Sequence, residues 1–315
     1  MSSTHRRRAR GLLVIGSAGS LRRAEELLAA HAALRPLRTA VAQRGGTAWR
    51  RLMDDAAAAI LLADPAMPVS EAVEGTHVGD GDRAVPVGVL PDDPRAIAAA
   101  AAVQRRATPG SRLSTGPIAL LSSREGHVRE RAARLAAVLA RGDAPFRDLP
   151  TGRVDRAELL PALAAGPGLV VYTGEGDARG WRGFGRIQSW ELDRPGGAPM
   201  GALVSLSCSG SARLGSIRGL CEVVVEHGVA ASAIGAISEV RREDDDTLGL
   251  TLAERVLAGA GSIAEAFAAP LPQLERFRIS GDPLAPFIGA RGSRAALLGI
   301  DAPAAGDPLA PVLWR

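Results

Sequence analysis

Two reactive side chains stand where two apolar segments end. Residues 169–173 lead into Gly174, Glu175 and Gly176, and residues 202–207 lead into Cys208. Short apolar runs are typical of strands buried on both faces of a parallel sheet. Ligands of α/β proteins bind at the carboxyl ends of such strands. We therefore expect Glu175 and Cys208 to face the same cleft.

The pair limits the chemistry that this cleft can perform. The thiolate of a cysteine is its nucleophilic form, and a neighbouring imidazolium favours that form. A neighbouring carboxylate disfavours it, because the thiolate would be a second negative charge. Glu175 would then serve as a protonated hydrogen-bond donor or general acid, or as a base toward a nucleophilic amine.

Other residues near the same edge offer parts of a site. His127 follows the expected strand 117–122, so it is either a substitute imidazole or a surface residue. Arg124, at the same rim, is either a ligand for a substrate carboxylate or simply solvated. Trp181 either lines a substrate groove or anchors the expected long loop 177–200.

Backbone groups and the thiol itself complete the candidate site. The turn containing Ser209 and Gly210 provides N–H groups for an oxyanion, as do Gly174 and Gly176. The alternative for Cys208 is a buried structural cysteine, which is also how we interpret Cys221, inside an expected helix.

The order of the expected elements predicts an α/β fold. Strands and helices alternate over residues 11–107 and again over 117–288, with a polar, turn-rich linker at 108–116. This pattern favours a parallel-sheet αβα sandwich, preceded by a smaller flavodoxin-like α/β subdomain. We expect residues 1–10 to be a disordered basic tail, residues 289–315 to be irregular, and the acidic segment 239–246 to be a solvated loop.

Composition narrows the functional class. The 315 residues carry a formal charge of +4 and a mean hydropathy of +0.07, so a full core is expected. The arginines are scattered, which argues against nucleic-acid binding, and no apolar run is long enough for a membrane span. Two cysteines without clustered histidines predict neither a disulfide framework nor a metal site, and no cofactor motif is complete. The expected compartment is the cytoplasm.

From residue 117 the order of motifs resembles the caspase–hemoglobinase fold, most closely its gingipain and CHAT branches. The matching segments are Tyr172-Thr173-Gly174-Glu175-Gly176, Ser207-Cys208-Ser209-Gly210, residues 228–236 and Gly281-Asp282-Pro283. The resemblance implies a cysteine nucleophile at Cys208 and peptide hydrolysis through a thioester. It also implies a histidine where this chain has Glu175.

Two hypotheses follow from this resemblance. The first is a divergent thiol enzyme that hydrolyses or transfers an amide or peptide-like group, with Cys208 as nucleophile and Glu175 as an altered acid or base. The second is a non-catalytic pseudopeptidase that serves as a binding or scaffold partner for another protein of a bacterial pathway.

Overall fold

The computed structural model describes residues 11–42, 51–53, 56–64, 73, 75–79, 84–107, 117–142, 145–212 and 218–287. The basic tail expected at 1–10, the linker at 108–116 and the irregular segment at 289–315 lie outside the described residues. None of the helices in the described part of the chain is long and apolar enough to cross a membrane.

The first half of the chain contains strands and helices. Its elements are β1 (Gly11–Gly16), α1 (Ala18–Arg23), α2 (Glu25–Ala32), β2 (Leu37–Val41), β3 (Ala56–Ala63), β4 (His77–Val78), β5 (Val85–Pro91) and α3 (Pro94–Arg106). The strands β2 to β5 follow one another with no α-helix among the described residues between them.

The second half contributes the two strands that carry the candidate site. Its elements are β6 (Ile118–Ser122), α4 (Gly126–Leu139), β7 (Phe146–Pro150), α5 (Arg156–Ala164), β8 (Leu169–Asp177), β9 (Gly180–Trp181), α6 (Gly183–Arg186), β10 (Ile187–Gln188), η4 (Ser189–Glu191), β11 (Met200–Cys208), α7 (Leu220–Glu226), β12 (Ala230–Ala236), α8 (Arg242–Leu257), α9 (Ile263–Ala266), η5 (Pro272–Arg276) and β13 (Phe277–Gly281).

Two segments differ from the sequence prediction. Residues 177–200 are not one loop, because β9 pairs back on the end of β8 and β10 pairs with β9. The acidic segment is not a solvated loop either. It begins α8, and Asp245 is buried, because a buried arginine supplies the counter-charge described below.

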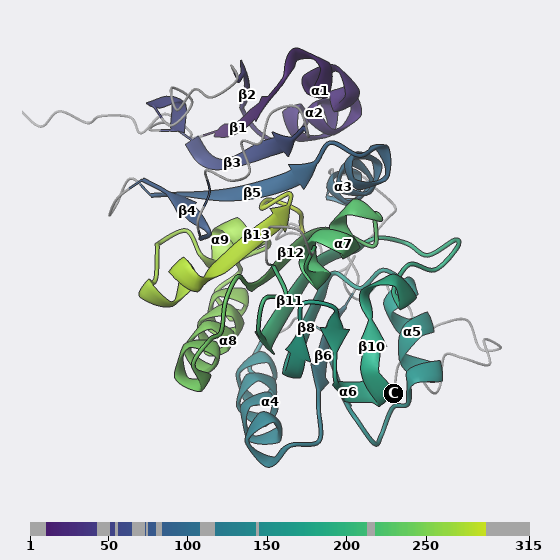
Figure 1. The fold of residues 1–315 in the computed structure, drawn as a ribbon. Helices are drawn as coiled ribbons and strands as arrows, with labels where there is room; N and C mark the ends of the chain where they lie inside the picture. The colour runs from purple at the N-terminus through teal and green to yellow at the C-terminus, as the bar shows by residue number, and fades with distance from the viewer. Residues whose placement is uncertain are drawn as a thin grey trace, which may run out of the picture.

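Both halves join in one sheet (Figure 1). The strands β6, β7, β8, β11 and β12 run parallel, and so do β1, β2, β3 and β5. Strand β13 connects the two groups, antiparallel to β12 and parallel to β5. The two parallel groups therefore run in opposite directions, and their carboxyl ends lie at opposite edges of the sheet.

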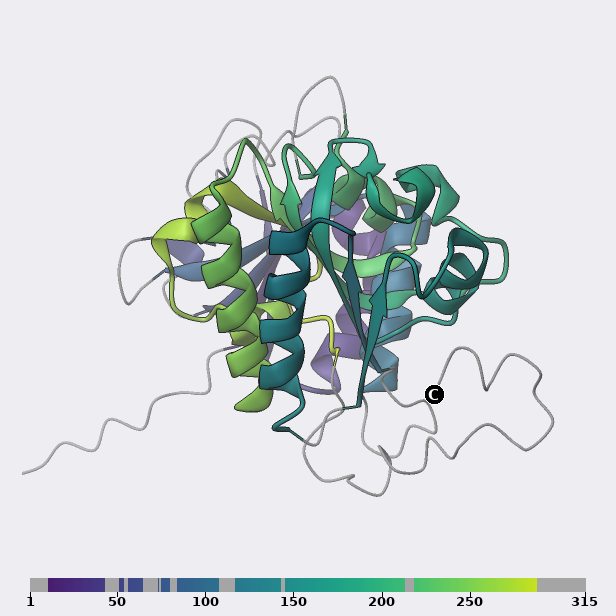
Figure 2. The ribbon, with the colours of Figure 1, turned by 90° about the horizontal axis from the view of Figure 1, so that it is seen from below.

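Helices cover both faces of this sheet (Figure 2). Side chains of α2, α3, α5 and α7 pack in a core on one face, and those of α4, α8 and α9 pack in a core on the other. This arrangement confirms the α/β fold class with a mostly parallel sheet between two helical layers.

A buried polar cluster ties the two halves together around Asp282, just after β13. Its carboxylate lies 2.9 Å from His31 Nε2 of α2 and accepts a 2.7 Å hydrogen bond from Gln104 of α3 and a 2.9 Å bond from the Leu284 N–H. Burial alone would raise the pKa of Asp282, but the interactions with His31 and Gln104 hold it below its ordinary value. The Gly-Asp-Pro motif is therefore a structural junction.

Candidate functional site

Cys208 is the last residue of β11 and is completely buried. It pairs with Gly176 of β8, and a Cβ added at Gly176 would lie 2.3 Å from the Cys208 sulfur. Because such a contact is impossible, only glycine fits opposite the thiol. The Sγ atom lies 3.7 Å from the carbonyl oxygen of Gly174.

Aromatic side chains close the space beside this thiol. Trp181 is buried and stacks on Tyr172, with ring centroids 4.5 Å apart, and its indole N–H donates a 3.2 Å hydrogen bond to Ser205. The Tyr172 hydroxyl donates to the carbonyl of Glu175 at 2.8 Å and accepts from the Gly183 N–H at 3.1 Å. These contacts fix the segment that leads from β8 to α6, and they make Trp181 part of the core.

The charged candidates make other contacts. Glu175 is exposed, and its carboxylate pairs with Arg182 at 3.2 Å. Arg124 is exposed beside Gly152, and His127 is half-buried at the start of α4. The structure thus brings Gly174, Gly176 and Trp181 to the Cys208 region. Among the described residues, it gives Cys208 no hydrogen bond to Glu175, His127 or Arg124.

The turn after β11 contains the remaining candidates. Ser209 is exposed, whereas Gly210 is buried and has a φ of +69°, a conformation that favours glycine. The Ser211 N–H closes the turn with a 3.1 Å hydrogen bond to the Cys208 carbonyl. This hydrogen bond fixes the turn that follows Cys208.

The electrostatics of the site keep the Cys208 thiol protonated. Burial raises its pKa to about 12, and the negative charges of Asp245 and Asp177 act in the same direction. A hydrogen bond with Ser205 and the charge of Arg182 oppose this shift but do not reverse it. A catalytic cysteine needs the opposite environment, one that is electropositive and partly exposed.

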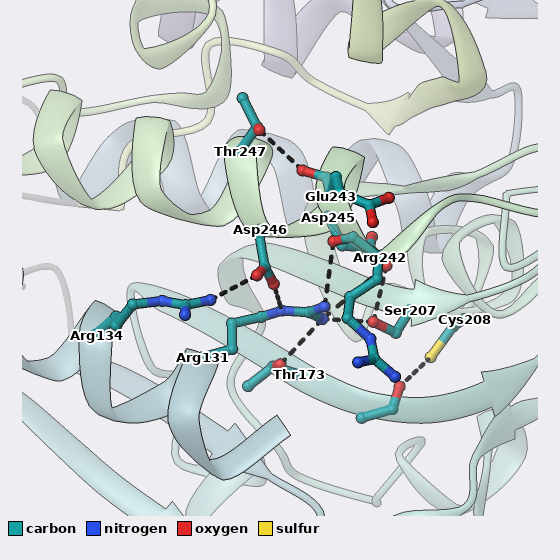
Figure 3. Close-up of polar contacts among 11 residues, drawn as sticks. Arg131, Arg134, Thr173, Ser207, Cys208, Arg242, Glu243, Asp245, Asp246 and Thr247 are labelled. Atoms are coloured by element: carbon teal, nitrogen blue, oxygen red, sulfur yellow. Dashed lines mark hydrogen bonds and ion pairs between the residues drawn. The ribbon is translucent and has the colours of Figure 1, made fainter. Parts of the chain in front are cut away.

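Arg131 of α4, which the sequence analysis missed, organises the other face of the same strand ends (Figure 3). The side chain is 1% exposed. Its guanidinium donates to Asp246, to the hydroxyl of Ser207 at 2.5 Å and to that of Thr173 at 3.4 Å. Ser207 in turn donates to Asp245 at 2.8 Å. One buried cation therefore connects α4, α8, β8 and β11.

This network holds Ser207 in a strained conformation directly before the thiol. Its φ is +61°, a left-handed value that costs a non-glycine residue about 1–2 kcal/mol. The pairing register between β8 and β11 shifts at the same point, between Leu206 and Cys208. The hydrogen bonds of Ser207 to Arg131 and Asp245 offset this strain. They also fix the backbone directly before Cys208.

A sequence signal for this network existed in the two helices. Arg131 lies in the apolar stripe of α4 with Val128, Ala132 and Leu135. Asp245 lies in the corresponding stripe of α8, together with residues 248, 249 and 252. A charge of each sign within an apolar stripe indicates a buried ion pair, since charged side chains are rarely buried alone.

A second buried acid lies in the first turn of α7. Both carboxylate oxygens of Glu222 are buried beside the amino end of this helix. Burial raises the pKa of Glu222 from 4.5 to about 7, although hydrogen bonds from the backbone of Glu222 and Gly219 and the charge of Arg278 partly oppose the shift. No group of three or more metal-ligating side chains is placed to hold a metal ion within the described ranges.

Solved structures share this fold. The arginine-specific cysteine proteinase gingipain R matches with a TM-score of 0.70 and 12% identity, over 91% of this chain and 80% of that chain. A complex of the Porphyromonas gingivalis RgpB pro- and mature domains matches with a TM-score of 0.68 and 14% identity, over 87% and 79%. A third structure, a protease, matches with a TM-score of 0.68 and 10% identity, over 89% and 79%.

No known family model and no curated protein matches the sequence. At the identities above, the structural likeness shows the fold alone. The chain has the α/β fold of these solved structures, as the order of its motifs predicts.

We predict that Arg131→Met lowers the free energy of unfolding by about 3–5 kcal/mol, because it leaves the buried carboxylate of Asp245 without its counter-charge. The double variant Arg131→Met/Asp245→Asn should recover part of this loss. The matched control is Arg134→Met, which removes an exposed partner of Asp246 and should cost less than about 1 kcal/mol. Urea unfolding measures all three, and equal effects at Arg131 and Arg134 would contradict the network.

We also predict that Glu222→Gln stabilises the protein at pH 8 but not at pH 4. The raised pKa means that the folded state binds the proton more tightly. The associated stability is therefore full below about pH 4.5 and is lost as the pH rises through about 7. Above that range the buried charge costs up to about 3 kcal/mol, which glutamine avoids.

Urea unfolding at the two pH values checks the Glu222 prediction. Glu226→Gln, on the same helix but in an ion pair with Arg218, is the control and should show no such gain at pH 8. A Glu222→Gln effect that does not change with pH would refute the assignment.

Proposed function

We propose that this chain is a non-catalytic, caspase-like protein that serves as a binding or scaffold partner, with Cys208 as a structural thiol. The observation that carries this proposal is the complete burial of Cys208 against Gly176. Because burial raises the pKa of the thiol far above neutrality, the thiol is protonated at pH 7. A protonated thiol has little reactivity as a nucleophile unless a base acts on it directly.

The position of the charged groups supports the same proposal. The carboxylate of Glu175 forms an ion pair with Arg182, which holds it away from the Cys208 sulfur. Even in contact with the thiol, an ionised carboxylate would raise the thiol pKa further. The half-buried His127 lies at the start of α4, and among the described residues it makes no hydrogen bond to Cys208.

The partner of such a scaffold would be a protein or peptide from the same pathway, and the expected compartment is the bacterial cytoplasm. The proposal assigns no nucleic acid, membrane, metal or cofactor to this chain. The fold then provides rigid edges and loops for recognition rather than an active centre.

A divergent thiol enzyme is the second candidate, and one observation favours it. Cys208 ends β11 beside the glycines of β8, at the carboxyl edge where α/β proteins perform chemistry. In this candidate, Sγ attacks the carbonyl carbon of a peptide or small amide while Glu175 takes the thiol proton. The proton passes to the leaving amine, and water then hydrolyses the thioester. Arg124 would bind a substrate carboxylate, and the backbone N–H groups of Gly174, Gly176, Ser209 and Gly210 would hold the oxyanion.

The two candidates are separated by replacing each buried cysteine in turn. We predict that Cys208→Ala and Cys221→Ala each lower the free energy of unfolding by about 1–3 kcal/mol, because both thiols are fully buried. We predict also that neither variant differs from the wild type in hydrolysis of a mixed library of fluorogenic peptides. Turnover that is lost in Cys208→Ala and kept in Cys221→Ala would instead establish the enzyme.

Substitution at Glu175 provides a second, independent comparison for the same assay. For a structural thiol, Glu175→His produces no peptide hydrolysis, since the imidazole finds no accessible sulfur. A gain of hydrolysis in Glu175→His that disappears in Glu175→His/Cys208→Ala would overturn the non-catalytic proposal.

A further inference from the structure

A cleft of about 550 Å³ lies at the edge of the sheet opposite to Cys208. Its walls come from the first turns of α3, the end of α5, the loop 192–199 that precedes β11, and the turn 227–229 that precedes β12. Because this edge holds the amino ends of β11 and β12 and the carboxyl end of β5, the cleft is separate from the thiol region. Its volume is that of a small-molecule site.

Charged side chains at the cleft are fixed by one bridging carboxylate. Asp193 accepts a 2.7 Å hydrogen bond from Arg95 through one oxygen and lies 3.1 Å from His227 Nδ1 through the other. Only one of the guanidinium nitrogens of Arg95 is used in this pair, so the remaining N–H groups are available to a ligand. Arg194, also exposed on the cleft wall, adds a further cation.

The rest of the lining is small and apolar. Ala98, Ala99 and Ala102 project from one side of α3, and Leu163 and Val229 close the far side. The methyl-sized side chains of these alanines leave space beside α3, while Arg95 of the same helix adds a long charged side chain to the wall. A ligand therefore meets cationic groups at the charged wall and aliphatic surface elsewhere.

The charged side chains of the cleft determine which kind of ligand it can bind. Two guanidinium groups lie on the wall of the cleft with one carboxylate, so the cleft favours a negative group. The Asp193 carboxylate opposes a dianion such as phosphate, because like charges at this range repel. The fork of an arginine binds a planar carboxylate through two parallel N–H hydrogen bonds.

We propose that this cleft binds a small aliphatic carboxylate, such as the free carboxyl end of a short peptide. Arg95 and Arg194 would hold the carboxylate, and the alanine face of α3 would accept the aliphatic part. The site is independent of Cys208, so it stands whether the thiol is structural or catalytic.

Isothermal titration of the full chain with N-acetyl-leucyl-alanine tests the proposal. We expect saturable binding at one site per chain, and at least tenfold weaker binding of the corresponding C-terminal amide. Arg95→Gln should weaken the acid at least tenfold, and Ala98→Phe, which fills the cleft from an exposed position, should abolish binding. The matched control Arg105→Gln removes an exposed arginine of α3 that pairs with Glu26 instead, and it should bind as the wild type does.

Further measurements make each outcome decisive. Thermal unfolding of every variant establishes that it is folded, and Cys208→Ala should bind the probe unchanged. Absence of saturable binding, equal affinity for acid and amide, or binding that survives both Arg95→Gln and Ala98→Phe would overturn the proposal. Equal or tighter binding of inorganic phosphate would overturn the preference for a carboxylate.

Discussion

The site region depends on one buried cation. The guanidinium of Arg131 lies in the layer between α4, α8 and the sheet, and a charge in that position is tolerated only when it is paired and hydrogen-bonded. Asp245, Asp246 and Ser207 supply that pairing. Arg131 therefore fixes the ends of β8 and β11 from the face that α4 and α8 cover.

This constraint determines the direction of Cys208. Successive side chains of a regular strand point to opposite faces, but Leu206 and Ser207 both face α4 and α8 because the register shifts between Leu206 and Cys208. This irregularity turns Cys208 to the other face. There the thiol meets Gly176 and belongs to the same core as Trp181 and Tyr172. The hydrophobic core therefore covers the end of β11 where Cys208 lies, and this burial raises the pKa of its thiol.

The sequence alone predicts those features of the fold that depend on the local pattern of apolar residues. The apolar runs before Glu175 and Cys208 predicted β8 and β11, and the alternation of elements predicted the helical layers. It did not reveal that β13 reverses direction beside β12, because strand pairing between distant segments leaves no local signature. Trp181 was ambiguous for a similar reason, since stacking on Tyr172 is a tertiary contact. The Arg131–Asp245 pair was visible only as charges within two apolar stripes.

In the folded protein, Cys208 is a protonated thiol that is buried from solvent. The direct measurement is the rate of alkylation of each cysteine by iodoacetamide at pH 7.5, resolved by peptide mass spectrometry in the native and urea-unfolded states. The account predicts that native Cys208 reacts at least about a thousandfold more slowly than in urea, as Cys221 does, because both react only through opening of the structure. Native Cys208 that is alkylated nearly as fast as the unfolded chain, while Cys221 stays protected, would contradict it.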